Sequence, residues 1–118
     1  MAGPKNLNRK EDKMRTINRD IQAAIKARAT VTLSKRDIVE SSDGITAVRL
    51  WSTAVAIINW VAGTVSFYAG NYHTSTTKDR INAVADLFRV PGVVQRDFTW
   101  IMTDGKLFDD GITYKFGL

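Results

Sequence analysis

The sequence predicts an α+β fold: an antiparallel sheet of roughly five strands with two helices packed on one face. Two segments have apolar residues at the three-and-four spacing of amphipathic helices, one over residues 8–28 and one that begins near Thr76. Between and after them lie short segments that alternate or run apolar, as strands do. Turn signals join most of these segments directly, which favours hairpins and antiparallel pairing over parallel crossovers.

Length and composition are those of one ordinary globular domain. The chain has 118 residues, of which 44% are hydrophobic and 25% charged. We expect a flexible tail over residues 1–7, followed by a single α+β domain over residues 8–118 with a basic N-terminal helix. There is no cysteine, which excludes disulfides, thiol catalysis and cysteine-ligated zinc. No apolar run approaches the roughly 20 residues of a membrane span, and the N-terminus lacks a signal-like apolar stretch, so we expect a cytoplasmic protein with no membrane partner.

The first helix is predicted from an Asn8-x-x-Glu11 start and from apolar residues such as Met14, Ile17 and Ile21. Residues 1–36 carry ten basic and three acidic residues, a net charge of +7, whereas the remainder has a net charge of −2. The basic residues that we expect on this helix to bind a partner are Arg9, Lys10, Lys13, Arg15, Arg19, Lys26 and Arg28. This asymmetry indicates an anionic partner, and a solvated face that keeps the protein soluble is the alternative.

The middle of the chain is predicted to be β. Residues 29–34 alternate as a short strand, and residues 41–44 make a turn. Residues 45–51 and the nearly all-apolar residues 53–60 form two further strands. Residues 64–69 alternate well and pair with the preceding strand as a hairpin.

The second helix is predicted from a Thr76-x-x-Asp79 cap, with helical periodicity from Ile81 onwards and an end at Pro91-Gly92. The C-terminal quarter returns to β structure. Residues 93–102 form one strand, and Asp104-Gly105 is a hairpin turn.

Catalysis is not expected. His73 is the only histidine, no nucleophile elbow is present, and no phosphate-loop or dinucleotide motif occurs. Asp104, Asp109 and Asp110 match no calcium-loop spacing, and their neighbouring glycines indicate turns. We therefore predict no enzyme activity, no metal and no cofactor.

The start of the second helix is the candidate phosphate site. Hydroxyls and backbone N–H groups at a helix N-terminus can receive an anion, and two basic residues follow. The residues of this site are Thr74, Ser75, Thr76, Thr77, Lys78 and Arg80. Simple helix capping is the alternative reading of the same residues.

Several aromatic residues fall in or beside the predicted strands. On an exposed sheet face they could stack on unpaired bases, with Arg49 and Arg96 as neighbours. We expect Trp60 and Phe67 to be core residues. The candidates for exposed stacking are Tyr68, Tyr72 and Trp100.

About 40 residues in the middle of the chain carry a pattern of two strands followed by a helix start. The residues that match are Ser52, Thr53, Val55, Gly63, Val65, Phe67, Tyr72, His73, Ser75, Thr76, Thr77, Lys78, Ile81 and Asn82. In this pattern the chain resembles small uncharacterised bacteriophage proteins. The resemblance implies a phage accessory protein that acts in the host cell cytoplasm, where such proteins commonly bind nucleic acid or disable a host factor.

Two functions are therefore open. The first is binding of nucleic acid, DNA or RNA, through the basic N-terminal helix. The alternative is an anti-defence or host-takeover inhibitor that binds an acidic surface of a host protein. A homo-oligomer is compatible with either function.

Overall fold

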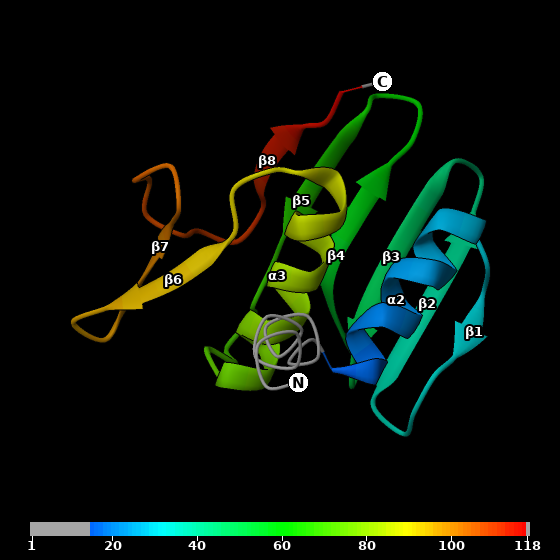
Figure 1. The fold of residues 1–118 in the computed structure, drawn as a ribbon, viewed down its shortest axis with the longest axis horizontal. Coiled ribbons are helices and arrows are strands. Elements are labelled where there is room, and N and C mark those ends of the chain that lie inside the picture. Colours follow the sequence, from blue (N-terminus) through cyan, green and yellow to red (C-terminus); the bar gives the residue numbers. More distant parts are fainter. Residues whose placement is uncertain (1–14, 118) are drawn as a thin grey trace, which may run out of the picture.

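Within residues 15–117, which the computed structural model describes, six strands form one antiparallel sheet and two helices lie on one of its faces (Figure 1). The elements are α2 (Thr16–Ala27), β1 (Val31–Thr32), β2 (Asp37–Ser42), β3 (Ile45–Leu50), β4 (Thr53–Asn59), β5 (Thr64–Phe67), α3 (Ser75–Phe88), β6 (Val93–Arg96), β7 (Thr99–Met102) and β8 (Ile112–Lys115). The sheet order is β1-β2-β3-β4-β5-β8, and β6 and β7 form a separate hairpin. The predicted α+β class is confirmed, with six strands in the main sheet in place of roughly five. The predicted tail over residues 1–7 and helix residues 8–14 lie outside the described residues.

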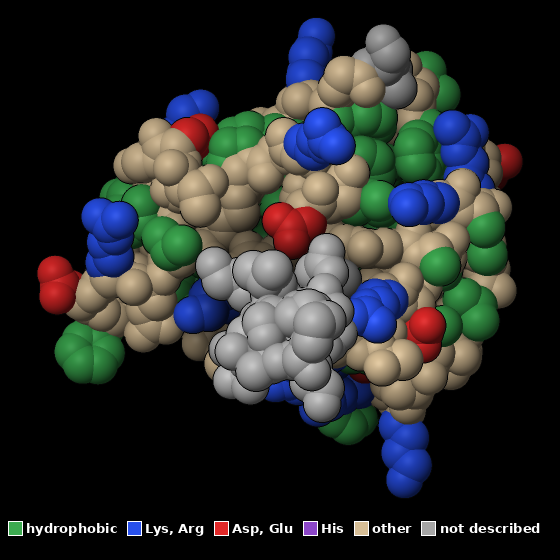
Figure 2. Space-filling model, viewed as in Figure 1, with side chains coloured by type: hydrophobic (Ala, Val, Ile, Leu, Met, Phe, Trp, Pro, Cys, Tyr) green, Lys and Arg blue, Asp and Glu red, His purple; other side chains and the backbone are tan. Residues whose placement is uncertain are grey.

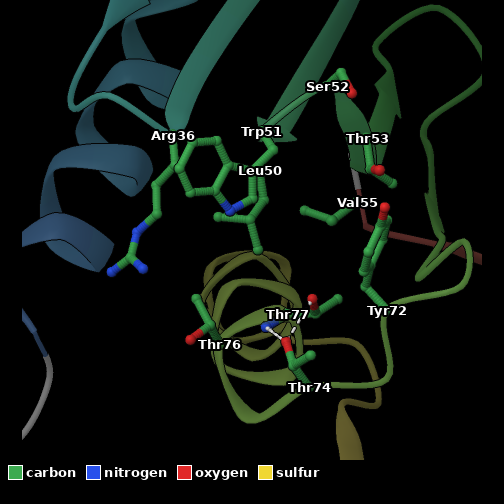
Figure 3. Close-up of a pocket in the computed structure, with 10 residues that line it drawn as sticks. All are labelled: Arg36, Leu50, Trp51, Ser52, Thr53, Val55, Tyr72, Thr74, Thr76 and Thr77. Atoms are coloured by element: carbon green, nitrogen blue, oxygen red, sulfur yellow. Dashed lines mark hydrogen bonds between the residues drawn. The ribbon is translucent and has the colours of Figure 1, made fainter.

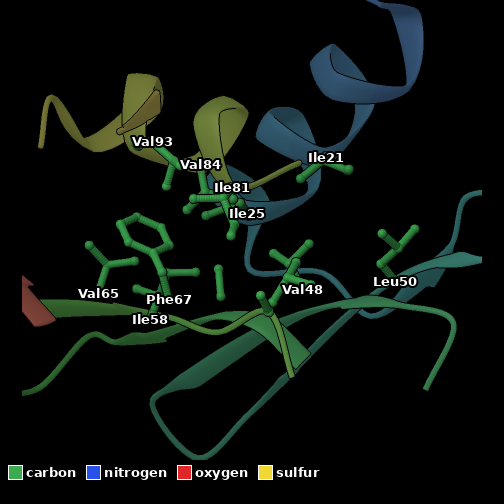
Figure 4. Close-up of a cluster of buried hydrophobic side chains, with 14 of the residues drawn as sticks. Ile21, Ile25, Val48, Leu50, Ile58, Val65, Phe67, Ile81, Val84 and Val93 are labelled. Atoms are coloured by element: carbon green, nitrogen blue, oxygen red, sulfur yellow. The ribbon is translucent and has the colours of Figure 1, made fainter. Parts of the chain in front are cut away.

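The core lies between the helices and the sheet (Figure 4). Alternation along the strands turns one set of side chains towards the helices, as a period of two requires. The central side chains, each at most 1% exposed, are Ile21 and Ile25 of α2, Ile81 and Val84 of α3, and Val48, Ile58, Val65 and Phe67 of the sheet. The opposite face carries a half-exposed row of side chains across five strands: Glu40, Ala47, Ile57, Ser66 and Thr113.

A buried arginine joins both helices to the sheet. Arg80 of α3 is 1% exposed, and its Nε donates to Asp37 Oδ1 of β2 at 2.7 Å. Its Nη1 donates to Asp79 Oδ2 at 2.9 Å and to Asn18 Oδ1 of α2 at 3.3 Å. Asn18 in turn donates to Asp79 Oδ2 at 2.9 Å. Every partner is hydrogen-bonded, which is the condition under which a buried charge is tolerated.

Helix α3 begins and ends earlier than predicted. Its N-cap is Thr74, whose Oγ1 accepts a hydrogen bond from the Thr77 backbone N–H at 3.2 Å, so the predicted cap at Thr76 is wrong by two residues. The helix ends at Phe88, and Arg89 adopts a left-handed conformation with φ of 57°. Capping of α3 by Thr74 agrees with the alternative prediction for this segment, in which these residues cap the helix.

The C-terminal part contains the clearest error of the sequence prediction. Residues 93–102 are two strands, β6 and β7, joined by a tight turn in which Asp97 and Phe98 both have positive φ. Asp97 suits the first position of this turn type, but Phe98 stands where glycine is preferred, so the pair is not a strong turn signal. β8 pairs with β5 of the main sheet, with Phe67 opposite Ile112.

Gly92 is required where β6 leaves the end of α3. A Cβ atom at this position would lie 2.5 Å from Asn82 Oδ1. The Asn82 side chain accepts from the Val93 N–H at 2.7 Å and donates to the Val93 carbonyl oxygen at 2.9 Å. The backbone at Gly92 and Val93 thus lies close to the Asn82 side-chain amide, and this contact attaches the start of the β6–β7 hairpin to α3.

Arg80→Ala should lower the free energy of unfolding by about 3–5 kcal/mol, because it leaves the buried Asp37 carboxylate without its closest cationic partner. Lys78→Ala, a change on the same helix away from the buried network, should stay within about 0.5 kcal/mol of wild type. Urea denaturation followed by circular dichroism measures both. A loss below about 1 kcal/mol for Arg80→Ala would show that the network contributes little.

Thr74→Ala should cost about 1 kcal/mol, since the Thr77 N–H loses the side chain that caps α3. Ser75→Ala is the matched control, because the Ser75 hydroxyl lies one residue beyond the cap and should matter little. The same denaturation experiment compares the two variants. Equal stability of both would contradict the assignment of Thr74 as the cap.

Candidate ligand-binding site at the start of α3

Three connecting segments meet at the end of the molecule where α2 and α3 both begin (Figure 1). They are the β1–β2 connection with Arg36, the β3–β4 turn with Trp51, and the loop from β5 to α3 with Tyr72. The Trp51 N–H donates to the Arg36 carbonyl oxygen at 2.6 Å and so ties the first two segments together. Loops held by a rigid scaffold are the usual carriers of binding residues.

A pocket of about 320 Å³ opens between these segments (Figure 3). Its lining combines aromatic rings, hydroxyl groups, one guanidinium group and apolar side chains. The lining residues are Arg36, Leu50, Trp51, Ser52, Thr53, Val55, Tyr72, Thr74, Thr76 and Thr77.

The predicted phosphate residues are only partly brought together here. Thr74, Thr76 and Thr77 line the pocket, whereas Ser75 is exposed and Lys78 stands on the first turn beside it. Thr74 and Thr77 are already engaged with each other, their hydroxyl oxygens 3.0 Å apart.

The inclusion of Arg80 in this phosphate site is wrong. Its side chain is 1% exposed and turns into the protein to meet Asp37 and Asp79, so it cannot contact a surface ligand. A carboxylate at Asp37 was visible in the sequence, but the spacing of 43 residues gives no local signal that the two meet.

The three predicted stacking residues lie in different surroundings. Tyr72 is 61% exposed and lines the pocket. Tyr68 is half-buried, and its ring lies against Gly111. The predicted exposure of Trp100 is wrong, since it is buried beneath the rings of His73 and Phe108, with centroids 4.6 and 5.3 Å away.

Trp51 and Arg36 are pocket residues that the sequence reasoning did not assign to it. Trp51 was placed at the end of the strand over residues 45–51, but it lies in the turn after β3 with φ of 58° and is 64% exposed. The short gap between the two predicted strands could have indicated its exposure. A gap of this length is a tight turn, and side chains in tight turns usually point to solvent. The pattern of residues 35–43 favours neither a helix nor a strand, so the sequence does not place Arg36.

The four described residues of the basic set predicted on the first helix, Arg15, Arg19, Lys26 and Arg28, are spread from one end of α2 to the other. Arg15 contacts Asp79 at 3.6 Å, and the Arg28 guanidinium lies 4.1 Å from the ring centroid of Trp60. Arg19 and Lys26 are exposed on α2, whereas the predicted residues Arg9, Lys10 and Lys13 lie outside the described residues. Figure 2 shows Lys and Arg side chains distributed across the helix-bearing face. Arg28 is not helical, since it adopts the left-handed conformation that ends α2.

Two aspartates of the C-terminal turns accept hydrogen bonds, Asp110 from backbone N–H groups and Asp104 from a tyrosine hydroxyl. Asp110 accepts hydrogen bonds from the Ala69 and Gly70 N–H groups at 2.9 and 3.0 Å, and so supports the loop that carries Tyr72. Partial burial, with the hydrogen bond and negative charge of Asp104, raises the pKa of Tyr114 to about 12. In the part of the chain from residue 15 to 117, no group of three or more acidic or histidine side chains could hold a metal ion.

The hairpin of β6 and β7 carries the most exposed large apolar side chain among the described residues. Phe98 at its tip is 96% exposed and has φ of 64°. A phenylalanine with positive φ is unfavourable in a turn. An exposed aromatic ring does not improve solubility either, so neither property explains why phenylalanine stands at this position.

The comparisons with known proteins place the chain in a family. Among residues 15–117, no helix is both long and apolar enough to cross a membrane. No curated protein and no solved structure matches the chain. Residues 14–116, nearly the whole sequence, match the family described as Kyanoviridae Gp96 protein, which is a family of phage proteins. The chain therefore belongs to the Kyanoviridae Gp96 protein family.

Proposed function

We propose that the protein binds nucleic acid through the end of the molecule where α2 and α3 begin. The observation that carries this proposal is the gathering of basic side chains from separate parts of the chain at that end. These residues, called the basic end below, are Arg15, Lys35, Arg36 and Lys78.

Two carboxylates at this end already pair with side chains of the protein. Asp37 is 1% exposed, and Asp79 bonds Arg80 and Asn18 as well as lying 3.6 Å from Arg15. Asp20, one turn into α2, is exposed. Basic side chains therefore outnumber carboxylates at the surface, and the positive dipole ends of two helices add to the same potential.

This arrangement revises the basic-helix hypothesis. The charge that contacts phosphates comes from the start of α2, from the β1–β2 connection and from the first turn of α3. Lys26 and Arg28 lie about 16 Å or more along α2 from Arg15, given a rise of about 1.5 Å per residue. They do not belong to the basic end.

Lys35→Gln and Lys78→Gln should each weaken binding to a fluorescently labelled single-stranded oligonucleotide and make its salt dependence shallower. Loss of one phosphate contact reduces the slope of log K against log salt by about 0.7 for a single strand. Fluorescence anisotropy at about 50 and about 200 mM salt measures affinity and slope together. Single-stranded DNA, single-stranded RNA and duplex DNA are titrated in parallel.

Lys115→Gln is the matched control, because it removes one charge from β8, opposite Thr64 and far from the β3–β4 turn. It should bind like wild type. The proposal fails if wild type binds none of the three nucleic acids at low salt. It also fails if Lys35→Gln and Lys78→Gln weaken binding no more than the control does.

A second candidate function is inhibition of a host protein, and exposed Phe98 is the observation that favours it. Aromatic anchors that fill a partner's apolar pocket dominate many protein interfaces. The hairpin of β6 and β7 presents this ring 96% exposed, away from the basic end.

If that function holds, wild-type protein should retain one stoichiometric protein from nuclease-treated host lysate, and Phe98→Ala should retain at least several-fold less of it. Leu107→Ala, which trims another exposed apolar side chain beside the hairpin, is the control. Equal retention of the same protein by wild type and Phe98→Ala would contradict an anchoring role for this ring.

A further inference from the structure

The pocket at the basic end has two exposed aromatic walls. The rings of Trp51 and Tyr72 stand on either side of it, with Val55 between them (Figure 3). The two residues are 64% and 61% exposed. Two large aromatic side chains therefore contribute little to the core. Exposed aromatic residues that line one concavity indicate a ligand with a flat apolar surface.

The backbone holds the Trp51 wall in place at a conformational cost. Trp51 has φ of 58°, a left-handed conformation in which a bulky residue is rare and which costs on the order of 1 kcal/mol or more. Its N–H donates to the Arg36 carbonyl oxygen at 2.6 Å. The same bond places Arg36 next to the indole. Glycine or asparagine would fit this turn with less strain.

The rim of the pocket is polar and positively charged. Arg36 lines the pocket, and its side chain is 41% exposed and lies 3.6 Å from the buried carboxylate of Asp37. Thr74 and Thr76 contribute hydroxyl groups from the start of α3. The floor is apolar, because Leu50 and Val55 are 5% and 1% exposed.

These groups together match one nucleotide. A flat base stacks on aromatic rings, an apolar floor excludes water beneath it, and a phosphate takes the guanidinium and hydroxyl groups. Free phosphate would make no use of the rings, and an uncharged apolar ligand would make no use of Arg36. The volume of about 320 Å³ lies at the lower end of the range for small-molecule pockets, about 300–1,000 Å³, which suits one base and its phosphate.

The geometry points to a pocket that receives one unpaired base of a single-stranded nucleic acid, between Trp51 and Tyr72, with its phosphate at Arg36. This inference rests on the proposed function and narrows its ligand. A base in a duplex is stacked and paired, so it reaches such a pocket only after it is extruded. The protein therefore prefers single strands to a duplex of the same sequence.

Trp51→Ala and Tyr72→Ala test the two walls. Each should weaken binding to a single-stranded oligonucleotide by roughly 5- to 150-fold, the range that stacking of one base spans. Trp51→Phe keeps an aromatic face and should stay within about 3-fold of wild type. Weak binding to duplex DNA, which depends on phosphate contacts, should stay unchanged in all three variants. Phe98→Ala is the matched control, since it removes a still more exposed ring from the β6–β7 hairpin, which projects away from the main sheet (Figure 1).

A titration with adenosine monophosphate tests the pocket without an oligonucleotide. Stacking of the base on Trp51 should quench indole fluorescence, and the quenching should disappear in Trp51→Phe, which keeps Trp60 and Trp100. Urea denaturation verifies that each variant is folded.

Two results distinguish failure of the pocket from failure of the function. If wild type binds single strands but Trp51→Ala and Tyr72→Ala bind as tightly as Phe98→Ala, the pocket assignment is wrong and the nucleic-acid function stands. If wild type binds no nucleic acid at low salt, the proposed function is wrong. Absence of quenching that depends on Trp51 would then overturn the pocket assignment as well.

Discussion

The buried Arg80 is the interaction on which the arrangement of both helices depends. Its guanidinium reaches Asp37 on β2, Asp79 on α3 and Asn18 on α2, so one side chain sets the position of α3 relative to the sheet and of α2 relative to α3. A buried ion pair contributes little net stability compared with apolar packing, but its loss leaves unpaired charges in the interior. Its hydrogen bonds also require Asn18 and Asp79, near the starts of α2 and α3, to lie side by side.

That requirement has a consequence for charge at the surface. Arg80 shares Asp37 with Arg36 and Asp79 with Arg15, so each of these carboxylates faces more than one cation. The neighbouring Arg36 and Lys78 therefore stand at a surface with few exposed acids. A structural network inside the protein thus favours an anion-binding surface outside it, and the exposed rings of the pocket restrict which anion fits.

Sequence periodicity predicted the fold class and most strands, because amphipathic spacing and alternation report burial directly. It could not predict contacts between distant residues, such as Arg80 with Asp37, and so it assigned a buried arginine to a surface site. It read residues 93–102 as one strand because Phe98 follows Asp97 where this turn type prefers glycine. For the site, it found the Thr74 segment and Tyr72 but not Trp51, whose exposure depends on a left-handed turn that propensity does not favour.

In the proposed complex, single-stranded nucleic acid lies across the basic end with a base between two aromatic rings. Photocrosslinking of wild-type protein to an oligonucleotide that carries 5-iodouracil, followed by mass spectrometry of the crosslinked peptides, locates the bound base. We expect crosslinks at Trp51 and Tyr72, the exposed rings that line the pocket. Crosslinks confined to the hairpin of β6 and β7 or to β8, in a sample that binds the oligonucleotide, would contradict this arrangement.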